Sequence, residues 1–70
     1  MGERHVVPDR GAGGWKVIGA HTGATEERST EQHEAVEAAC EQLRRSEGGD
    51  VLIHGLDGTV QERRTVSPDA

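Results

Sequence analysis

The segment from Thr30 to Glu47 constrains the fold most, because it is the one stretch whose pattern predicts a long helix. Its apolar residues recur at intervals of three and four, which places them on one side of a helix. They are Ala35, Val36, Ala39, Cys40 and Leu43. Since these side chains are small and form a narrow stripe, the sequence predicts one helix lying close against a sheet.

Residues at both ends of this segment favour the same helix. Ser29 fits an N-cap, and Gln32 stands where the return partner of a capping box belongs. Gly48 and Gly49 follow the segment and suit a left-handed C-terminal cap. The helix should therefore begin just after Ser29.

Two pairs of β-prone segments flank the helix. The first pair, Arg4 to Pro8 and Trp15 to Ala20, is joined by a glycine-rich loop and predicts a hairpin. The second pair is Val51 to His54 and Thr59 to Val66, joined by a turn that contains Asp-Gly, a strong hairpin signal. The polar stretch from His21 to Arg28 reads as a connection.

The expected architecture is α+β with the order ββαββ. Two β-hairpins form one antiparallel-rich sheet, and a single helix packs on one face of it. All 70 residues make one domain, ordered from about residue 4 to residue 66, with residues 67–70 as a tail. One helix covers one sheet face, so the other face must be polar or meet a partner.

The core is expected to be thin. Only 31% of the residues are hydrophobic, there is one Trp and neither Phe nor Tyr, and a single Cys excludes an intramolecular disulfide. Self-association would bury further surface, so we expect a homodimer. We predict the following structural residues, the first five in the core, His54 beside the second hairpin turn and the last two in that turn: Trp15, Val17, Ala39, Cys40, Ile53, His54, Asp57 and Gly58.

The net charge of −5 disfavours nucleic acid and anionic membranes as partners. A local exception is a candidate binding surface on the helix-free sheet face, formed by Lys16, Ile18, Arg63 and Arg64. No apolar run is long enough for a membrane span, and no secretory leader precedes the first strand, so we expect a cytoplasmic protein.

Several segments together resemble a known family. The resemblance spans roughly His5 to Val60 and is carried by His5-Val6-Val7-Pro8, Gly13-Gly14-Trp15-Lys16-Val17, Gly19-Ala20 and Ile53-His54-Gly55-Leu56-Asp57-Gly58. This set is similar to domain of unknown function 2188, a family of short stand-alone microbial proteins. The resemblance implies a ββαββ fold and no assigned activity, so it transfers no catalytic residue.

Three groups of residues invite a chemical interpretation. His5 and His54 could converge on a metal with Asp57, but no recognised metal-ligand spacing occurs, and His54 is better explained as orienting the adjacent turn. Cys40 has His33 on the same helix side, but it lies within the apolar stripe, where a thiol is usually inert. The run from Gly11 to Gly14 joins two strands, whereas a phosphate loop precedes a helix.

We therefore expect no catalytic, cofactor-binding or metal-binding residue and no enzymatic activity. The function that fits best is a small non-enzymatic module for protein–protein interaction or homo-oligomerisation, acting through the helix-free sheet face or a strand edge. The alternative is a nucleic-acid-binding accessory protein that uses a basic patch on the exposed sheet face.

Overall fold

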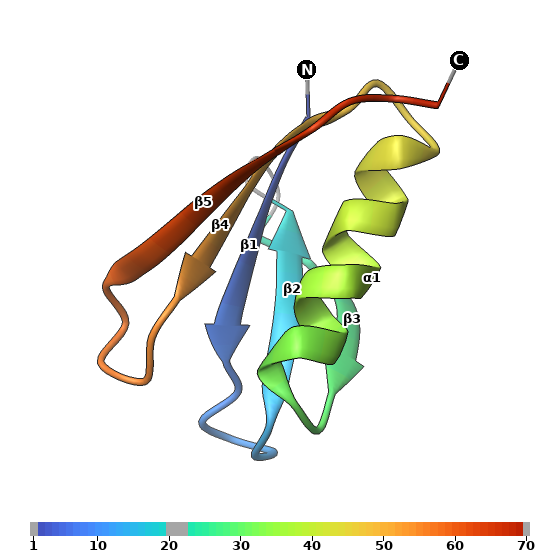
Figure 1. The fold of residues 1–70 in the computed structure, drawn as a ribbon. Coiled ribbons are helices and arrows are strands. Elements are labelled where there is room, and N and C mark those ends of the chain that lie inside the picture. Colours follow the sequence, from blue (N-terminus) through green and yellow to red (C-terminus); the bar gives the residue numbers. More distant parts are fainter. Residues whose placement is uncertain (1, 20–22, 70) are drawn as a thin grey trace.

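A computed structural model describes residues 2–19 and 23–69 (Figure 1). Five strands and one helix follow one another as β1 (Gly2–Pro8), β2 (Trp15–Gly19), β3 (Thr25–Ser29), α1 (Gln32–Arg44), β4 (Gly49–His54) and β5 (Val60–Val66). The expected strand end at Ala20, His21 of the expected connection and Ala70 of the expected tail lie outside the described residues.

The sheet has the strand order β3-β2-β1-β4-β5. Neighbouring strands are antiparallel except β1 and β4, which are parallel at the centre of the sheet. A parallel neighbour needs a crossover connection, and α1 supplies it by running back from β3 across one face of the sheet (Figure 1). The fold is α+β with one helix on one face, as the sequence predicts, but the sheet is mixed.

The sheet has five strands where the sequence predicted four. The additional strand, β3, lies within the stretch interpreted as a connection. Its sequence, Thr-Glu-Glu-Arg-Ser, contains no apolar residue, so no hydrophobic pattern marks it. It forms because its backbone pairs with β2 at the edge of the sheet, where Trp15 faces Ser29 and Lys16 faces Arg28.

The core lies between α1 and the central strands. The five residues of the predicted helix stripe are all buried, and they meet Val6, Val17, Val51 and Ile53. The sequence predicted Trp15 as the largest core side chain, but it is only partly buried and packs against the edge of this cluster. Among the described residues, Leu43 is instead the largest fully buried side chain, and it packs at the C-terminal end of α1 beside Gly2 at the start of β1.

The helix begins at Gln32, later than predicted, and its N-cap is Glu31, whose side chain makes no cap hydrogen bond. Ser29 is not the cap, because it is the last residue of β3 and pairs with Trp15. Gln32 does not return to the cap either, since its side-chain amide donates to the His54 carbonyl oxygen at 3.2 Å. This bond ties the start of α1 to the end of β4.

The helix ends with the glycine pair that the sequence singled out. Gly48 has a φ of 73° and its N–H donates to the Leu43 carbonyl oxygen at 2.8 Å, which caps the helix. Residues 67–69 then cross this end of the helix, where the Asp69 N–H donates to the Arg44 carbonyl oxygen at 2.8 Å. Part of the expected tail thus contacts the domain.

Candidate functional site

Among residues 2–19 and 23–69, no helix or strand covers the sheet face that points away from α1, and we call this face the open face. Since Val6, Val17, Val51 and Ile53 point toward α1, their neighbours along each strand point to the open face. The open face carries Glu3, His5, Val7, Lys16, Ile18, Arg28, Asp50, Leu52, His54, Arg63 and Thr65. It is the candidate functional surface of the molecule.

Two histidines meet at the centre of the open face. His5 on β1 and His54 on β4 have ring centroids 5.1 Å apart, and Nδ1 of His5 lies 2.8 Å from Nε2 of His54. The sequence suggested that both lie in strands but left open whether they approach each other. They meet because β1 and β4 are parallel neighbours, in which His5 faces Leu52, two residues before His54.

The outer nitrogens of this histidine pair are also held. Nε2 of His5 lies 3.1 Å from a carboxylate oxygen of Glu3, and Nδ1 of His54 lies 2.9 Å from the Gly58 carbonyl oxygen. The result is a chain of contacts from Glu3 through both rings to the β4–β5 turn. Three strands and one turn therefore fix the orientation of the two imidazoles, since His5 is also flanked by Ile18 of β2.

Asp57 serves the turn and not the histidines. Its Oδ1 accepts the backbone N–H of Thr59 at 3.1 Å and the hydroxyl of Thr59 at 2.8 Å. These bonds hold the pKa of Asp57 below its ordinary value. The carboxylate beside the histidine pair is thus Glu3, not the Asp57 considered from the sequence.

The four residues of the predicted binding surface do not form one patch. Lys16 and Ile18 lie on the open face in β2, and Arg63 lies on the same face in β5, with β1 and β4 between them. Arg64 faces Val51 and so lies on the helix side of β5. Adjacent residues of a strand point to opposite faces, which separates Arg63 from Arg64.

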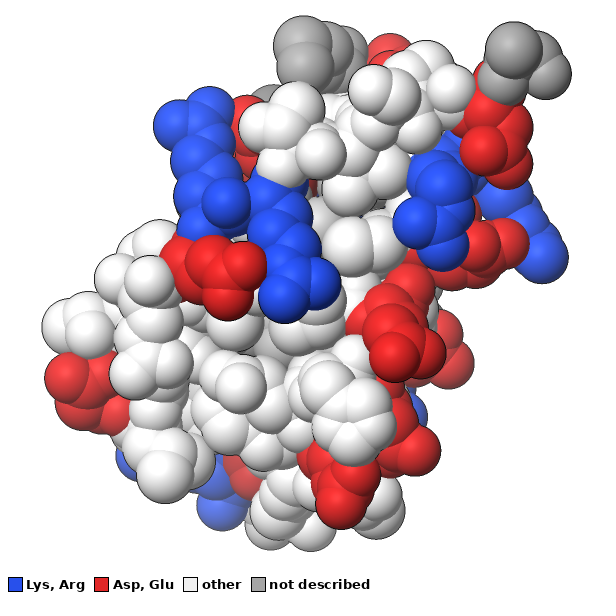
Figure 2. Space-filling view, in the orientation of Figure 1, with Lys and Arg blue, Asp and Glu red and all other residues white. Residues whose placement is uncertain are grey.

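Both arginines have carboxylate partners. Arg63 donates to Asp50 at 2.6 Å, and Arg64 donates to Glu62 at 2.8 Å. Each guanidinium pKa is raised by its partner. On the helix-bearing side, Figure 2 shows basic side chains lying beside acidic ones and no continuous basic area.

Cys40 lies in the core on the inner side of α1, with 9% of its surface exposed. His33 is exposed on α1, and its Nδ1 lies 3.4 Å from a carboxylate oxygen of Glu31. The structure therefore gives the thiol packing neighbours, including Val36 and Leu43, and directs His33 toward Glu31.

The glycine-rich loop between β1 and β2 closes around Asp9. Its Oδ1 accepts the Ala12 N–H at 3.1 Å, and this bond chiefly lowers the pKa of Asp9. Asp9 is nearly buried, and its Oδ2 has Arg28 Nε at 3.4 Å but no hydrogen bond. Backbone groups that would cradle a phosphate are thus already used by an aspartate.

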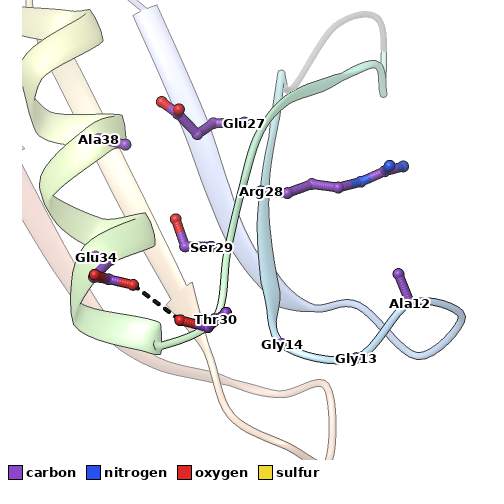
Figure 3. A pocket seen from close by; sticks show the side chains of 9 residues that line it. All are labelled: Ala12, Gly13, Gly14, Glu27, Arg28, Ser29, Thr30, Glu34 and Ala38. Atoms are coloured by element: carbon purple, nitrogen blue, oxygen red, sulfur yellow. Dashed lines mark hydrogen bonds between the residues drawn. The ribbon is translucent and has the colours of Figure 1, made fainter.

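A shallow open groove runs between this loop, β3 and the start of α1 (Figure 3). Glu27 and Ser29 point from β3 toward the helix, where Glu34 accepts the Thr30 hydroxyl at 3.2 Å, while Arg28 points away (Figure 3). Two glutamates and no cation line the helix side, which disfavours an anionic ligand.

The family model of an uncharacterized protein conserved in bacteria, DUF2188, matches residues 4–66. The match covers most of the chain and both central strands of the sheet. The chain belongs to the DUF2188 family. No curated protein and no solved structure matches the chain.

Sequence reasoning missed two residues of this DUF2188 protein. Glu3 precedes the expected first strand, although its carboxylate holds His5, and Asp9 follows that strand in the expected loop, which its side chain organises. The sequence does carry a signal for Asp9, because an Asp that starts a glycine-rich loop typically accepts a hydrogen bond from a backbone N–H a few residues later. For Glu3 the signal is its position two residues from His5, which puts both on one face of a strand.

Over residues 2–19 and 23–69, the DUF2188 chain shows no group of three or more His, Cys, Asp or Glu side chains arranged to hold a metal ion. In the same ranges, no helix has the length and apolar character needed to cross a membrane.

Proposed function

We propose that this DUF2188 protein is a non-enzymatic interaction module that forms a homodimer through the open face. The observation that carries the proposal is the composition of that face. Val7, Ile18 and Leu52 lie there half-buried among the strands with no helix above them. An apolar strip on an uncovered sheet face gains free energy when a second layer covers it.

The open face also has opposite charges at its two ends. Glu3 and Asp50 are register partners at the end where β1 and β4 begin. Lys16 and Arg28 are register partners at the other end. At the first end, Glu3 and Asp50 outnumber Arg63, which leaves a net negative charge. At the other end, Lys16 and Arg28 outnumber Asp9, which leaves a net positive charge.

This polarity suits a second copy of the same chain. A two-fold axis lying between two open faces, perpendicular to the strands, would set the acidic end of each copy against the basic end of the other. Such an isologous arrangement uses one patch twice. It pairs unlike charges around a shared apolar centre, and these charge pairs fix how the two copies align.

The sheet edges are less suited to pairing. The exposed side chains of β3 include Glu27 and Arg28, and those of β5 include Glu62, Arg63 and Arg64. Charged side chains on edge strands discourage the addition of another strand. Association through the face is therefore favoured over extension of the sheet.

The contact should be weak. Five strands spaced by about 4.8 Å span roughly 19 Å across the face. The strands are five to seven residues long, or roughly 20 Å at about 3.3 Å per residue, so the face covers roughly 400 Å². Specific interfaces typically bury about 800 Å² per partner. We expect a dissociation constant of the dimer in the micromolar range, so the experiment must cover high micromolar protein concentrations.

The nucleic-acid alternative has less support. It needs a basic strip, but Arg63 and Arg64 lie on opposite faces and each pairs with a carboxylate. A gel shift at low salt that is lost in the double Ala variant of these arginines would restore it.

The experiment is light scattering coupled to size exclusion over a range of concentrations. Leu52→Lys places a charge at the centre of the open face and should give a monomer. Leu56→Lys is the matched control, because Leu56 is 73% exposed in the β4–β5 turn. It should dimerise as the unmodified chain does. A chain that stays monomeric at high micromolar concentration, or a Leu52→Lys variant that is folded and still dimeric, would refute the proposal.

A further inference from the structure

The partners of the histidine pair fix where two of its protons are. The Gly58 carbonyl oxygen only accepts, so Nδ1 of His54 must carry a hydrogen to bond it. An ionised Glu3 also only accepts, so Nε2 of His5 must carry a hydrogen. The second nitrogen of each ring then faces the other histidine.

Those other nitrogens face each other. With both outer positions protonated, Nδ1 of His5 and Nε2 of His54 are lone-pair positions only 2.8 Å apart. Two neutral rings in this arrangement would repel, so a cation is needed between them. A cation bound by both nitrogens removes this repulsion, whether it is a proton shared by the two rings or a metal ion.

We propose that the His5–His54 pair is also a chelating site for a divalent late first-row transition metal, which binds in place of the shared proton. Neutral imidazole nitrogen is a preferred ligand of Zn²⁺, Ni²⁺ and Cu²⁺. On binding, the shared proton leaves to solvent and each inner nitrogen donates its lone pair to the metal. The site uses one copy of the chain, so it does not depend on dimer formation.

The outer contacts are those of metal-ligating histidines. Such a histidine usually donates its second N–H to a carboxylate or a backbone carbonyl, which fixes the ring and raises its basicity. Glu3 provides the carboxylate for His5, and Gly58 provides the carbonyl for His54. Both supports are in place on rigid neighbouring strands.

The spacing requires a small adjustment. Zn–N bonds of about 2.0–2.1 Å at a tetrahedral angle place two ligand nitrogens about 3.3 Å apart. The rings must therefore separate by about 0.5 Å. They are tilted by 42°, and His5 is 24% exposed, so rotation of the side chains can supply this change.

The surroundings leave the remaining metal positions to water. By register, His5 is flanked by Ile18 and Leu52, which supply no ligand. The charged groups that face this region are Glu3, Lys16 and Arg63, and Arg63 is held by Asp50. Two protein ligands are fewer than a structural zinc site has, so we expect a moderate affinity and an exchangeable metal.

The test uses Zn²⁺ alone with the 70-residue chain, at concentrations where light scattering finds it monomeric. Competition with a chromogenic chelator gives affinity and stoichiometry, and imidazole ¹⁵N NMR reports the ligands. We expect one Zn²⁺ per chain and shifts at His5 and His54. Calorimetry in two buffers should show proton release at a pH where the pair holds its shared proton, and tighter binding as pH rises.

Variants identify the ligands. His5→Gln and His54→Gln should each weaken binding at least about tenfold through loss of chelation. Glu3→Gln keeps both ligands and should weaken it by about tenfold. His33→Gln, on exposed α1, should change nothing.

Several results would overturn the site. One is a dissociation constant for Zn²⁺ weaker than about 1 mM. Another is that His33→Gln and His54→Gln lose equal affinity for Zn²⁺. A third is that Zn²⁺ shifts the NMR signals of His33 and not those of His5 and His54. If His5→Gln or His54→Gln fails to fold, the NMR spectra of the unmodified chain and the Zn²⁺ affinity of Glu3→Gln still test whether the two histidines bind the metal.

Discussion

Gly49 and Gly2 are register partners across the parallel β1–β4 pair, and the Gly2 backbone lies so close to Gly49 that position 49 has no room for a side chain. A Cβ at Gly49 would overlap the carbonyl oxygen of Gly2, and Gly49 also has a φ of 143°, which L residues rarely adopt. The contact follows directly on the helix cap at Gly48. It is the point at which the chain turns from α1 into the central strand.

Gly49→Ala should therefore destabilise the fold by about 3 kcal/mol or more, because strain and overlap add. The free energy of unfolding from urea titration measures it. Gly58→Ala is the matched control, since Gly58 has a φ of 88° but a Cβ there meets no atom within 4 Å. Gly58→Ala should lower the free energy of unfolding by about 1–2 kcal/mol, from backbone strain alone. Equal losses would mean that the close approach to Gly2 has no energetic effect.

Leu43→Ala should be among the most destabilising changes in the core, at about 2–5 kcal/mol, because it empties the largest fully buried position. Urea denaturation followed by circular dichroism measures the loss. Leu56→Ala provides the control with the same change of side chain, and at 73% exposure it should stay within about 0.5 kcal/mol of the parent. A small loss at Leu43 would place the centre of the core elsewhere.

The helix was predictable because its signal is periodic and local. Every residue of the stripe from Ala35 to Leu43 is buried, as the spacing indicates. The cap was not predictable in the same way. Ser29 and Gln32 have the residue types of a capping box, but β3 pairing takes Ser29 and the end of β4 takes the Gln32 amide. Tertiary contacts override local preference there.

The sheet was only partly predictable, because strand pairing depends on residues far apart in the chain. No property of β3 alone distinguishes it from a polar loop, and nothing in β1 or β4 states that they are parallel neighbours. The histidine pair inherits this limit. His5 and His54 are visible as strand residues, but their contact exists only through the β1–β4 register. Its size suggests Trp15 for the core, but it is the first residue of β2 and therefore lies at the edge of the core.

Cys40 should react slowly with a disulfide reagent such as Ellman's reagent in the folded protein, because the thiol is packed under α1 and only 9% exposed. Reaction in urea should be fast, and the ratio of the two rates gives the protection. Cys40→Ala provides the blank for the reagent. Rapid reaction of the folded chain would show an accessible, activated thiol and would revive a catalytic interpretation.

Acid should destabilise the protein through aspartates whose pKa values are lowered by folding. Arg63, followed by Thr65, lowers the pKa of Asp50, and the Ala12 N–H chiefly lowers that of Asp9, both from an ordinary value of 3.8. Well above 3.8, at about pH 5 and higher, the carboxylates are ionised in both the folded and the unfolded state, and the stabilisation is fully present. As the pH falls below this value the unfolded chain binds protons first, so stability is lost until the folded carboxylates titrate.

The urea midpoint should accordingly fall between about pH 5 and about pH 2.5. Asp50→Asn removes one titrating group while keeping an oxygen that can accept from Thr65, so its midpoint should fall less steeply over this interval. Leu56→Ala, which changes no titrating group, should leave the slope unchanged. An identical slope in Asp50→Asn and the parent would mean that the Arg63–Asp50 contact on the open face does not persist in solution.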